Sequence, residues 1–116
     1  MDPQTYRLLH IVGLFAVFLG LGGSLALVDA GKSAGRAIAL ALHGLGLIVV
    51  LVAGFGLQAK LLDGFPMWLI TKIALWLVIG ALPFLVRKRY VPPVVGWIVA
   101  LAAGATAAWL VLERPF

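Results

Sequence analysis

The chain has 116 residues, of which 64% are hydrophobic and 11% are charged, with a formal net charge of +5 and no cysteine. So little polar surface excludes a soluble globular domain, whereas a lipid bilayer accepts an apolar surface. The absence of cysteine excludes disulfides and thiolate metal sites. The nine Lys and Arg residues lie mostly at the ends of apolar runs, where they meet phospholipid head groups, so nucleic acid is not an expected partner.

Four apolar runs fill the chain. Each is long enough to cross a hydrocarbon core about 30 Å thick at about 1.5 Å of helical rise per residue. The runs predict membrane-spanning helices at residues 8–28, 37–59, 65–86 and 91–112. Because the connections are short, consecutive helices must be antiparallel neighbours. The sequence therefore predicts an all-α, polytopic membrane protein, an up-down-up-down four-helix bundle that forms a single domain over residues 1–116.

The distribution of basic residues predicts the orientation in the membrane. The connections at one end of the predicted bundle carry Lys32, Arg36, Arg87, Lys88 and Arg89. The opposite side carries Arg7, Lys60, Arg114 and, deeper in the third span, Lys72. The positive-inside rule places the first set in the cytoplasm, so both termini are expected in the periplasm of a bacterial inner membrane.

Small side chains recur at every fourth position in two of the spans. They are Ala16, Gly20 and Ser24 in the first span and Gly96, Ala100, Gly104 and Ala108 in the fourth. Helices in lipid associate through close backbone contact along such faces rather than by burying apolar area. These two stripes predict helix packing, either within one bundle or against another chain in a self-associating protein.

Two imidazoles and one cation lie inside the spans, and polar groups in a membrane are costly enough to suggest a function. His10 is near the start of the first span, and His43 is six residues inside the second span, which enters from the opposite side. Helical rise separates the two by about 18 Å along the membrane normal. Within one chain they cannot ligate the same haem iron, because metal–nitrogen bonds are about 2 Å long. Two separate sites, or pairing with a partner chain, stay open.

Each of these residues also has a purely structural interpretation. His10 can point toward head groups, and His43 can hydrogen-bond another helix as polar packing. Arg36 is seven residues before His43, two helical turns away, so the two are expected to share one inward face. Lys72 is expected to extend toward the interface, where lipid phosphate or Asp63 could receive its charge.

The four acidic residues all lie in termini or connections, at Asp2, Asp29, Asp63 and Glu113. Without an embedded carboxylate, the usual coupling group of a small exporter is missing, which counts against a transporter. The sequence also has no His-x-x-x-His pair, serine triad or phosphate-binding loop. These absences predict a protein that is not an enzyme and has no dedicated metal site.

Three blocks of sequence carry a family resemblance. They are Tyr6-Arg-Leu-Leu-His10-Ile-Val-Gly13 with Gly22-Gly23 later in that span, Arg36 to His43 with Ala53-Gly54-Phe55-Gly56-Leu57, and Phe65-Pro-Met-Trp68-Leu-Ile-Thr-Lys72. These blocks resemble the small four-span bacterial inner-membrane proteins of the SirB and CopD type. The resemblance implies an accessory membrane protein, with a link to copper in CopD-like proteins and to haem in related cytochrome b-like bundles.

Three functions remain as expectations. The favoured one is a non-enzymatic accessory or self-associating subunit in the bilayer, as a homo-oligomer or within a larger membrane complex. The first alternative is a haem b-binding, electron-transfer protein that uses His43 and possibly His10. The second is a small oligomeric transporter. Copper is disfavoured, because the chain has no cysteine and Met1 and Met67 form no methionine cluster.

Overall fold

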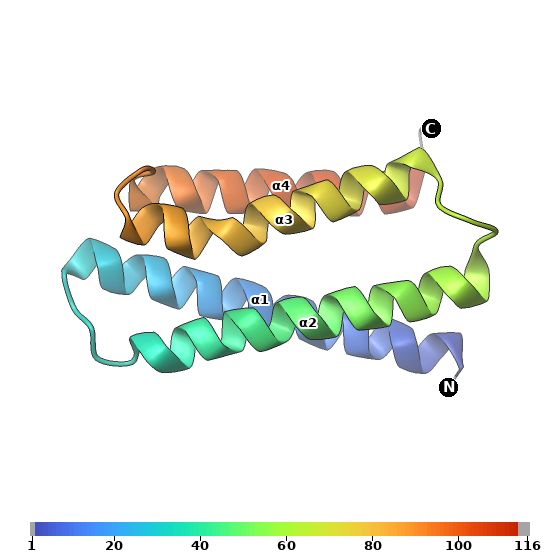
Figure 1. Ribbon diagram of the computed structural model, residues 1–116, viewed down its shortest axis with the longest axis horizontal. Coiled ribbons are helices and arrows are strands. Elements are labelled where there is room, and N and C mark those ends of the chain that lie inside the picture. Colours follow the sequence, from blue (N-terminus) through green and yellow to red (C-terminus); the bar gives the residue numbers. More distant parts are fainter. Residues whose placement is uncertain (1, 114–116) are drawn as a thin grey trace.

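The computed structural model describes residues 2–113 and consists of four α-helices (Figure 1). These are α1, Pro3–Ala30; α2, Arg36–Leu61; α3, Met67–Arg87; and α4, Pro93–Glu113. No strand occurs among the described residues. All four helices are long and apolar enough to cross a membrane. The predicted all-α four-helix bundle is therefore confirmed.

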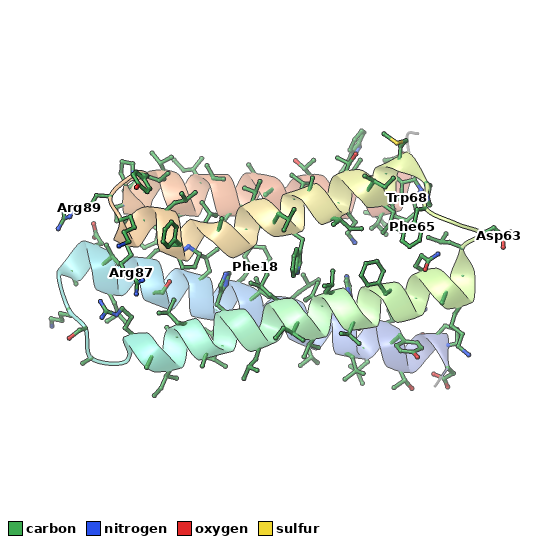
Figure 2. The ribbon with its side chains drawn as sticks, in the orientation of Figure 1. Phe18, Asp63, Phe65, Trp68, Arg87 and Arg89 are labelled. Atoms are coloured by element: carbon green, nitrogen blue, oxygen red, sulfur yellow. The ribbon has the colours of Figure 1, made fainter. Side chains whose placement is uncertain are left out.

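The two ends of the bundle differ in what they carry. The α1–α2 and α3–α4 connections lie together at one end, and we call this the basic end because of the five basic residues named above (Figure 1). The α2–α3 connection lies at the opposite end, beside the start of α1 and the end of α4, and we call this the far end. Figure 2 shows Arg87 and Arg89 at the basic end and Asp63 and Phe65 at the far end.

The helix boundaries depart from the predicted spans where capping and proline residues set them. α1 begins five residues before the apolar run, because the Asp2 carboxylate accepts a hydrogen bond of 2.8 Å from the backbone N–H of Thr5. That bond also holds the pKa of Asp2 below its usual value. α3 and α4 each begin two residues later than predicted, since Pro66 and Pro92 lie just before the first helical residue.

α1 and α2 pack backbone against backbone at glycine residues. A Cβ placed on Gly20 would lie 2.5 Å from the backbone nitrogen of His43, and one on Gly46 would lie 2.7 Å from that of Val17. A Cβ on Gly13 would lie 3.1 Å from the backbone nitrogen of Val50. Only glycine fits at residues 20 and 46, and a Cβ on Gly13 would force its neighbours to shift. This pair of helices makes the most extensive contact in the bundle.

The predicted stripe on α1 contributes to this contact only in part. Gly20 lies at the contact itself, whereas Ala16 is half-buried beside it. Ser24 is buried, and its hydroxyl donates a hydrogen bond of 3.2 Å to the Leu21 carbonyl of the same helix. The α1 glycines at which a Cβ would meet the backbone of α2 are Gly13 and Gly20, seven residues apart rather than four.

The predicted stripe on α4 faces the interior of its own chain. Gly96 and Ala100 are buried. A Cβ on Gly104 would lie 2.9 Å from the ring of Phe18, which Figure 2 shows between the two helical hairpins. Ala108, the last member of the stripe, is exposed. Most of the stripe is therefore used for packing inside the bundle.

The two hairpins, α1–α2 and α3–α4, meet in an apolar core. Its buried members are Val17, Leu21, Leu25, Val50, Ile79, Leu82, Val86, Ala100 and Ala103. The contacts between α2 and α3 are sparse compared with those between α1 and α2, and α2 does not come close to α4 over residues 2–113. Thus α2 is held firmly on one side and loosely covered on the other.

Large apolar side chains cover the outside of the bundle. Leu112, Leu101 and Phe15 are 81%, 75% and 71% exposed. In water this surface would be an extensive hydrophobic patch, whereas in a bilayer it is the expected lipid-facing surface. The four apolar helices with this outer surface fit a multi-pass membrane protein.

Candidate functional site

His43 on α2 is a buried imidazole with one nitrogen bonded and the other free. Its side chain is 4% exposed. Its Nδ1 lies 3.0 Å from the backbone carbonyl oxygen of Val17 on α1. Since a carbonyl oxygen only accepts, Nδ1 carries the proton and donates it. Nε2 is then a bare acceptor in the neutral ring, and it has no hydrogen-bond partner.

A cavity of about 270 Å³, the basic-end cavity, opens between α2 and α3 and is lined by His43. Arg36, the first residue of α2, and Arg87, the last of α3, also line it, so two arginines stand at its outer end. Leu40 and Phe84 contribute apolar wall. No Asp or Glu is among the lining residues. The cavity therefore combines positive charge, an imidazole and apolar walls.

A second cavity of about 310 Å³, the far-end cavity, repeats this arrangement at the other end of α2 and α3. His10 lines it and, by the same reasoning as for His43, donates from Nδ1 to the Val50 carbonyl at 2.9 Å. Arg7 and Lys72 are its cations. Trp68, labelled in Figure 2, also lines this cavity, and none of the lining residues is acidic.

Trp76 of α3 lies between the two cavities. Its indole N–H donates a hydrogen bond of 3.1 Å to the backbone carbonyl of Leu47 on α2. Trp76 lines the far-end cavity, while Leu47 lines the basic-end cavity. One turn further along α3, a Cβ on Gly80 would lie 3.3 Å from the Leu47 side chain. This contact joins α2 to α3 at the middle of the bundle.

The structure places the predicted polar residues in two groups. Arg36 and His43 line the same cavity, as their shared helix face suggests. His10 and Lys72 line the other cavity. α1 rises by about 15 Å between His10 and Gly20, the residue packed against the backbone of His43. The two imidazoles therefore lie too far apart within one chain to share one metal ion.

The sequence suggests Asp63 or lipid phosphate as the partner for the charge of Lys72; Asp63 lies elsewhere, and lipid phosphate stays a prediction. Asp63 is exposed in the α2–α3 connection, where Figure 2 shows it at the tip of the far end. Lys72 lies instead among the residues of the far-end cavity with His10 and Arg7. Among residues 2–113, no group of three or more His, Asp or Glu side chains is placed to hold a metal ion.

Two residues of the site escape prediction from the sequence. In the sequence, Arg87 contributes only to the count of basic residues that predicts the orientation in the membrane, because nothing there shows that the end of α3 faces the start of α2. The sequence pattern assigns Trp76 no role in a site, although its position ten residues into α3 sets it well below any interface. That depth was the available signal, because a buried indole N–H must find an acceptor.

Comparison with known proteins gives no match to a family model, to a curated protein or to a solved structure. The resemblance to SirB-type and CopD-type proteins therefore stays a prediction.

Proposed function

We propose that this is a non-enzymatic, multi-pass membrane protein that binds the anionic head group of a lipid between α2 and α3. The single observation that carries the proposal is the basic-end cavity, where Arg36, Arg87 and His43 meet without an acidic lining residue. Two guanidinium groups gathered at one end of a cavity attract an anion. A lipid phosphate supplies one and can accept two parallel hydrogen bonds from an arginine.

The position of the cavity favours a lipid over a small water-soluble anion. Basic pockets between membrane helices, at the level of the head groups, bind acidic lipids such as cardiolipin. Arg36 and Arg87 are at helix termini and therefore at that level, while apolar residues such as Leu40 and Phe84 suit acyl chains.

Haem b is a second candidate, and the free, buried Nε2 of His43 is the observation that favours it. An imidazole that ligates iron through Nε2 usually donates its Nδ1 proton to a carbonyl, as His43 does. Arg36 and Arg87 could pair with the two propionates. The cavity lining has no second His, Met or Lys, so His43 would be the side chain that holds the haem there. When bound, haem supplies electron transfer or binding of a diatomic gas.

Lipid remains the better proposal because of space. The cavity of about 270 Å³ would have to widen to accept a porphyrin, whereas a head group needs no such change. His10 offers haem a comparable ligand in the far-end cavity, but its imidazole is only half-buried there. Absorbance decides between them: a Soret band that His43→Ala removes would establish haem, and a colourless preparation from haem-replete cells would exclude it.

Self-association through the α4 stripe has little support. Gly96, Ala100 and Gly104 pack against their own chain, so only Ala108 of that stripe is on the surface. A lipid-binding site is also compatible with a role as an accessory subunit of a larger membrane complex. For location we propose the bacterial inner membrane, with the basic end in the cytoplasm and the far end in the periplasm, since the basic end carries more positive charge.

The lipid proposal is tested by native mass spectrometry of protein extracted from its own membrane. We expect anionic phosphatidylglycerol or cardiolipin to copurify in preference to zwitterionic phosphatidylethanolamine. The double variant Arg36→Gln and Arg87→Gln should lose about 90% or more of that lipid, equivalent to about 1.4 kcal/mol or more of binding free energy.

The matched control is Lys32→Gln with Lys88→Gln. These two lysines are exposed residues of the connections at the same end, and their replacement removes the same charge without touching the cavity. The control should keep its lipid. Equal loss in both double variants would mean that lipid is held by overall charge, and unchanged lipid in both would contradict the proposal.

A further inference from the structure

The residues that line the two cavities form one continuous face on α2. The basic-end cavity is lined by Leu40, His43 and Leu47, and the far-end cavity by Val50, Gly54 and Gln58. These six residues follow one another at steps of three or four, which keeps them on one side of a helix. The face therefore runs along α2 without a break, even though the space beside it is divided.

The facing surface of α3 is continuous in the same way. Its lining positions include Trp68, Lys72 and Trp76 in the far-end cavity and Gly80, Pro83 and Arg87 in the basic-end cavity. The steps are again three or four residues. The two cavities thus lie one after the other between the same two helix faces, and we call this α2–α3 interface, with its two separate cavities, the α2–α3 groove. The Trp76–Leu47 hydrogen bond lies at the point where it is closed.

Positive or hydrogen-bonding groups recur along this groove from end to end. Arg36 and Arg87 stand at the basic end, and His43 lies about 10 Å further along α2. Beyond Trp76 come Lys72, His10 and Arg7. None of the residues that line either half is acidic. An anionic group would therefore meet a cation or an imidazole in each half of the membrane.

We propose that the α2–α3 groove is a passage through which the head group of an anionic phospholipid crosses between the two leaflets, while its acyl chains stay in the bilayer. Trp76 closes the passage in the conformation described here. The proposal rests on the proposed function, because the same cavities must bind the head group. Movement is downhill and requires no chemical step.

The packing of the helices supports an opening at this place. α2 is fixed to α1 by glycine contacts, whereas it meets α3 sparsely and has no close contact with α4 over the described residues. The α3–α4 hairpin can therefore move away from α2 without disturbing the α1–α2 contact. Between α2 and α3, the opening must break the bond from the Trp76 indole to the Leu47 carbonyl, and the α3–α4 hairpin must also shift on the apolar core that it shares with α1.

The test is a lipid-translocation assay on the full chain reconstituted in liposomes. Fluorescent phosphatidylglycerol and phosphatidylcholine report the fraction of each lipid that a membrane-impermeant quencher reaches with time. Wild-type protein should move phosphatidylglycerol faster than protein-free liposomes do. Trp76→Ala should raise that rate about tenfold, because it removes both the indole ring and its hydrogen bond.

Two further variants separate gating from general damage. Trp109→Ala removes an exposed tryptophan of α4, 51% exposed and away from the groove, and should leave the rate unchanged. Lys72→Met keeps a long side chain but removes the charge, and should slow phosphatidylglycerol about tenfold in the Trp76→Ala background. Circular dichroism verifies that each variant is folded.

The outcomes distinguish this inference from the proposed function. If phosphatidylglycerol copurifies as described above but neither wild type nor folded Trp76→Ala exceeds protein-free liposomes, the passage is refuted and the binding site stands. If phosphatidylcholine moves as fast as phosphatidylglycerol, the cationic groove is not what selects the lipid, and the inference is wrong. If anionic lipid never copurifies with the wild type, the proposed function itself is refuted.

Discussion

The two sides of α2 differ in what they pack against. Toward α1, glycines let the two backbones touch, and nothing larger than a hydrogen atom fits at Gly20 or Gly46. Toward α3, the same helix borders two cavities, and a tryptophan bridges the gap. The contrast indicates that α1 and α2 form the fixed part of this bundle, and that polar groups are concentrated where packing is least complete.

The largest expected effect on stability comes from adding a side chain at the close contact between α1 and α2. Gly20→Leu would place a side chain where the backbone of His43 already lies, so α1 and α2 must move apart. Overpacking of this kind costs about 1–3 kcal/mol or more, and here there is backbone rather than a flexible side chain opposite. We expect loss of the folded bundle, or a large drop in the thermal midpoint in detergent, measured by circular dichroism.

The matched control is Gly22→Ala, two residues along the same helix. A Cβ there meets nothing within 4 Å. Alanine is also favoured over glycine inside a helix by about 0.5–1 kcal/mol, so stability should stay equal or rise slightly. If both variants lose stability alike, glycine in α1 serves something other than close approach to α2.

An intermediate effect is expected where the two sides meet, at His43. His43→Phe keeps a ring in the space and removes the hydrogen bond to Val17, together with the unpaired Nε2. Loss of the bond and relief of the unpaired nitrogen offset each other, so the free energy of unfolding should change by only about 1 kcal/mol. Binding of anionic lipid should fall several-fold, as read by native mass spectrometry.

The opposite result for His43→Phe would change the assignment of His43 between the two sides of α2. If His43→Phe unfolds the protein while lipid binding by the surviving fraction is normal, His43 belongs to the fixed α1–α2 contact and not to the cavity. His43→Gln sharpens the test, because its amide can still donate to the Val17 carbonyl and accept at its oxygen. It should therefore bind more lipid than His43→Phe.

The smallest effect is expected at Asp2, which touches neither side of α2. Asp2→Ala removes the cap that holds the first turn of α1, so the thermal midpoint should fall slightly at neutral pH. The pKa of this carboxyl is lower in the folded than in the unfolded protein, so its stabilisation is present above its ordinary value near 3.8. It is lost as the pH falls through the folded-state value, and the variant and wild-type midpoints should converge there.

The architecture could be predicted from the sequence, because long apolar runs determine the number and length of the helices. Four apolar stretches with short connections permit little besides an antiparallel bundle. The sequence also brings Arg36 and His43 together correctly, since residues on one helix face are placed by helical geometry alone. Where proline or a capping carboxylate fixes an end, as at Pro66 and Asp2, the boundaries shift by two to five residues.

From the sequence, only those site residues that lie on the same helix could be placed relative to one another. Arg36 and Arg87 line one cavity, and His10 and Lys72 line the other. Which residues of different helices share a cavity depends on which helix faces meet, and the periodicity within one helix does not contain that information. The same limit applies to packing. A search for small residues at every fourth position finds Gly20 but passes over Gly13 and Gly46, which matter only because of what lies opposite.

The glycine contact between α1 and α2 also bears on how the chain is made. Synthesis runs from the N-terminus, so both partners of this contact enter the membrane before α3 is complete. The first hairpin can therefore assemble while the second is still being inserted. Gly64, with φ 88° in the α2–α3 connection, is the residue at which the second hairpin turns back toward it. The groove can form only after α3 has joined this first hairpin.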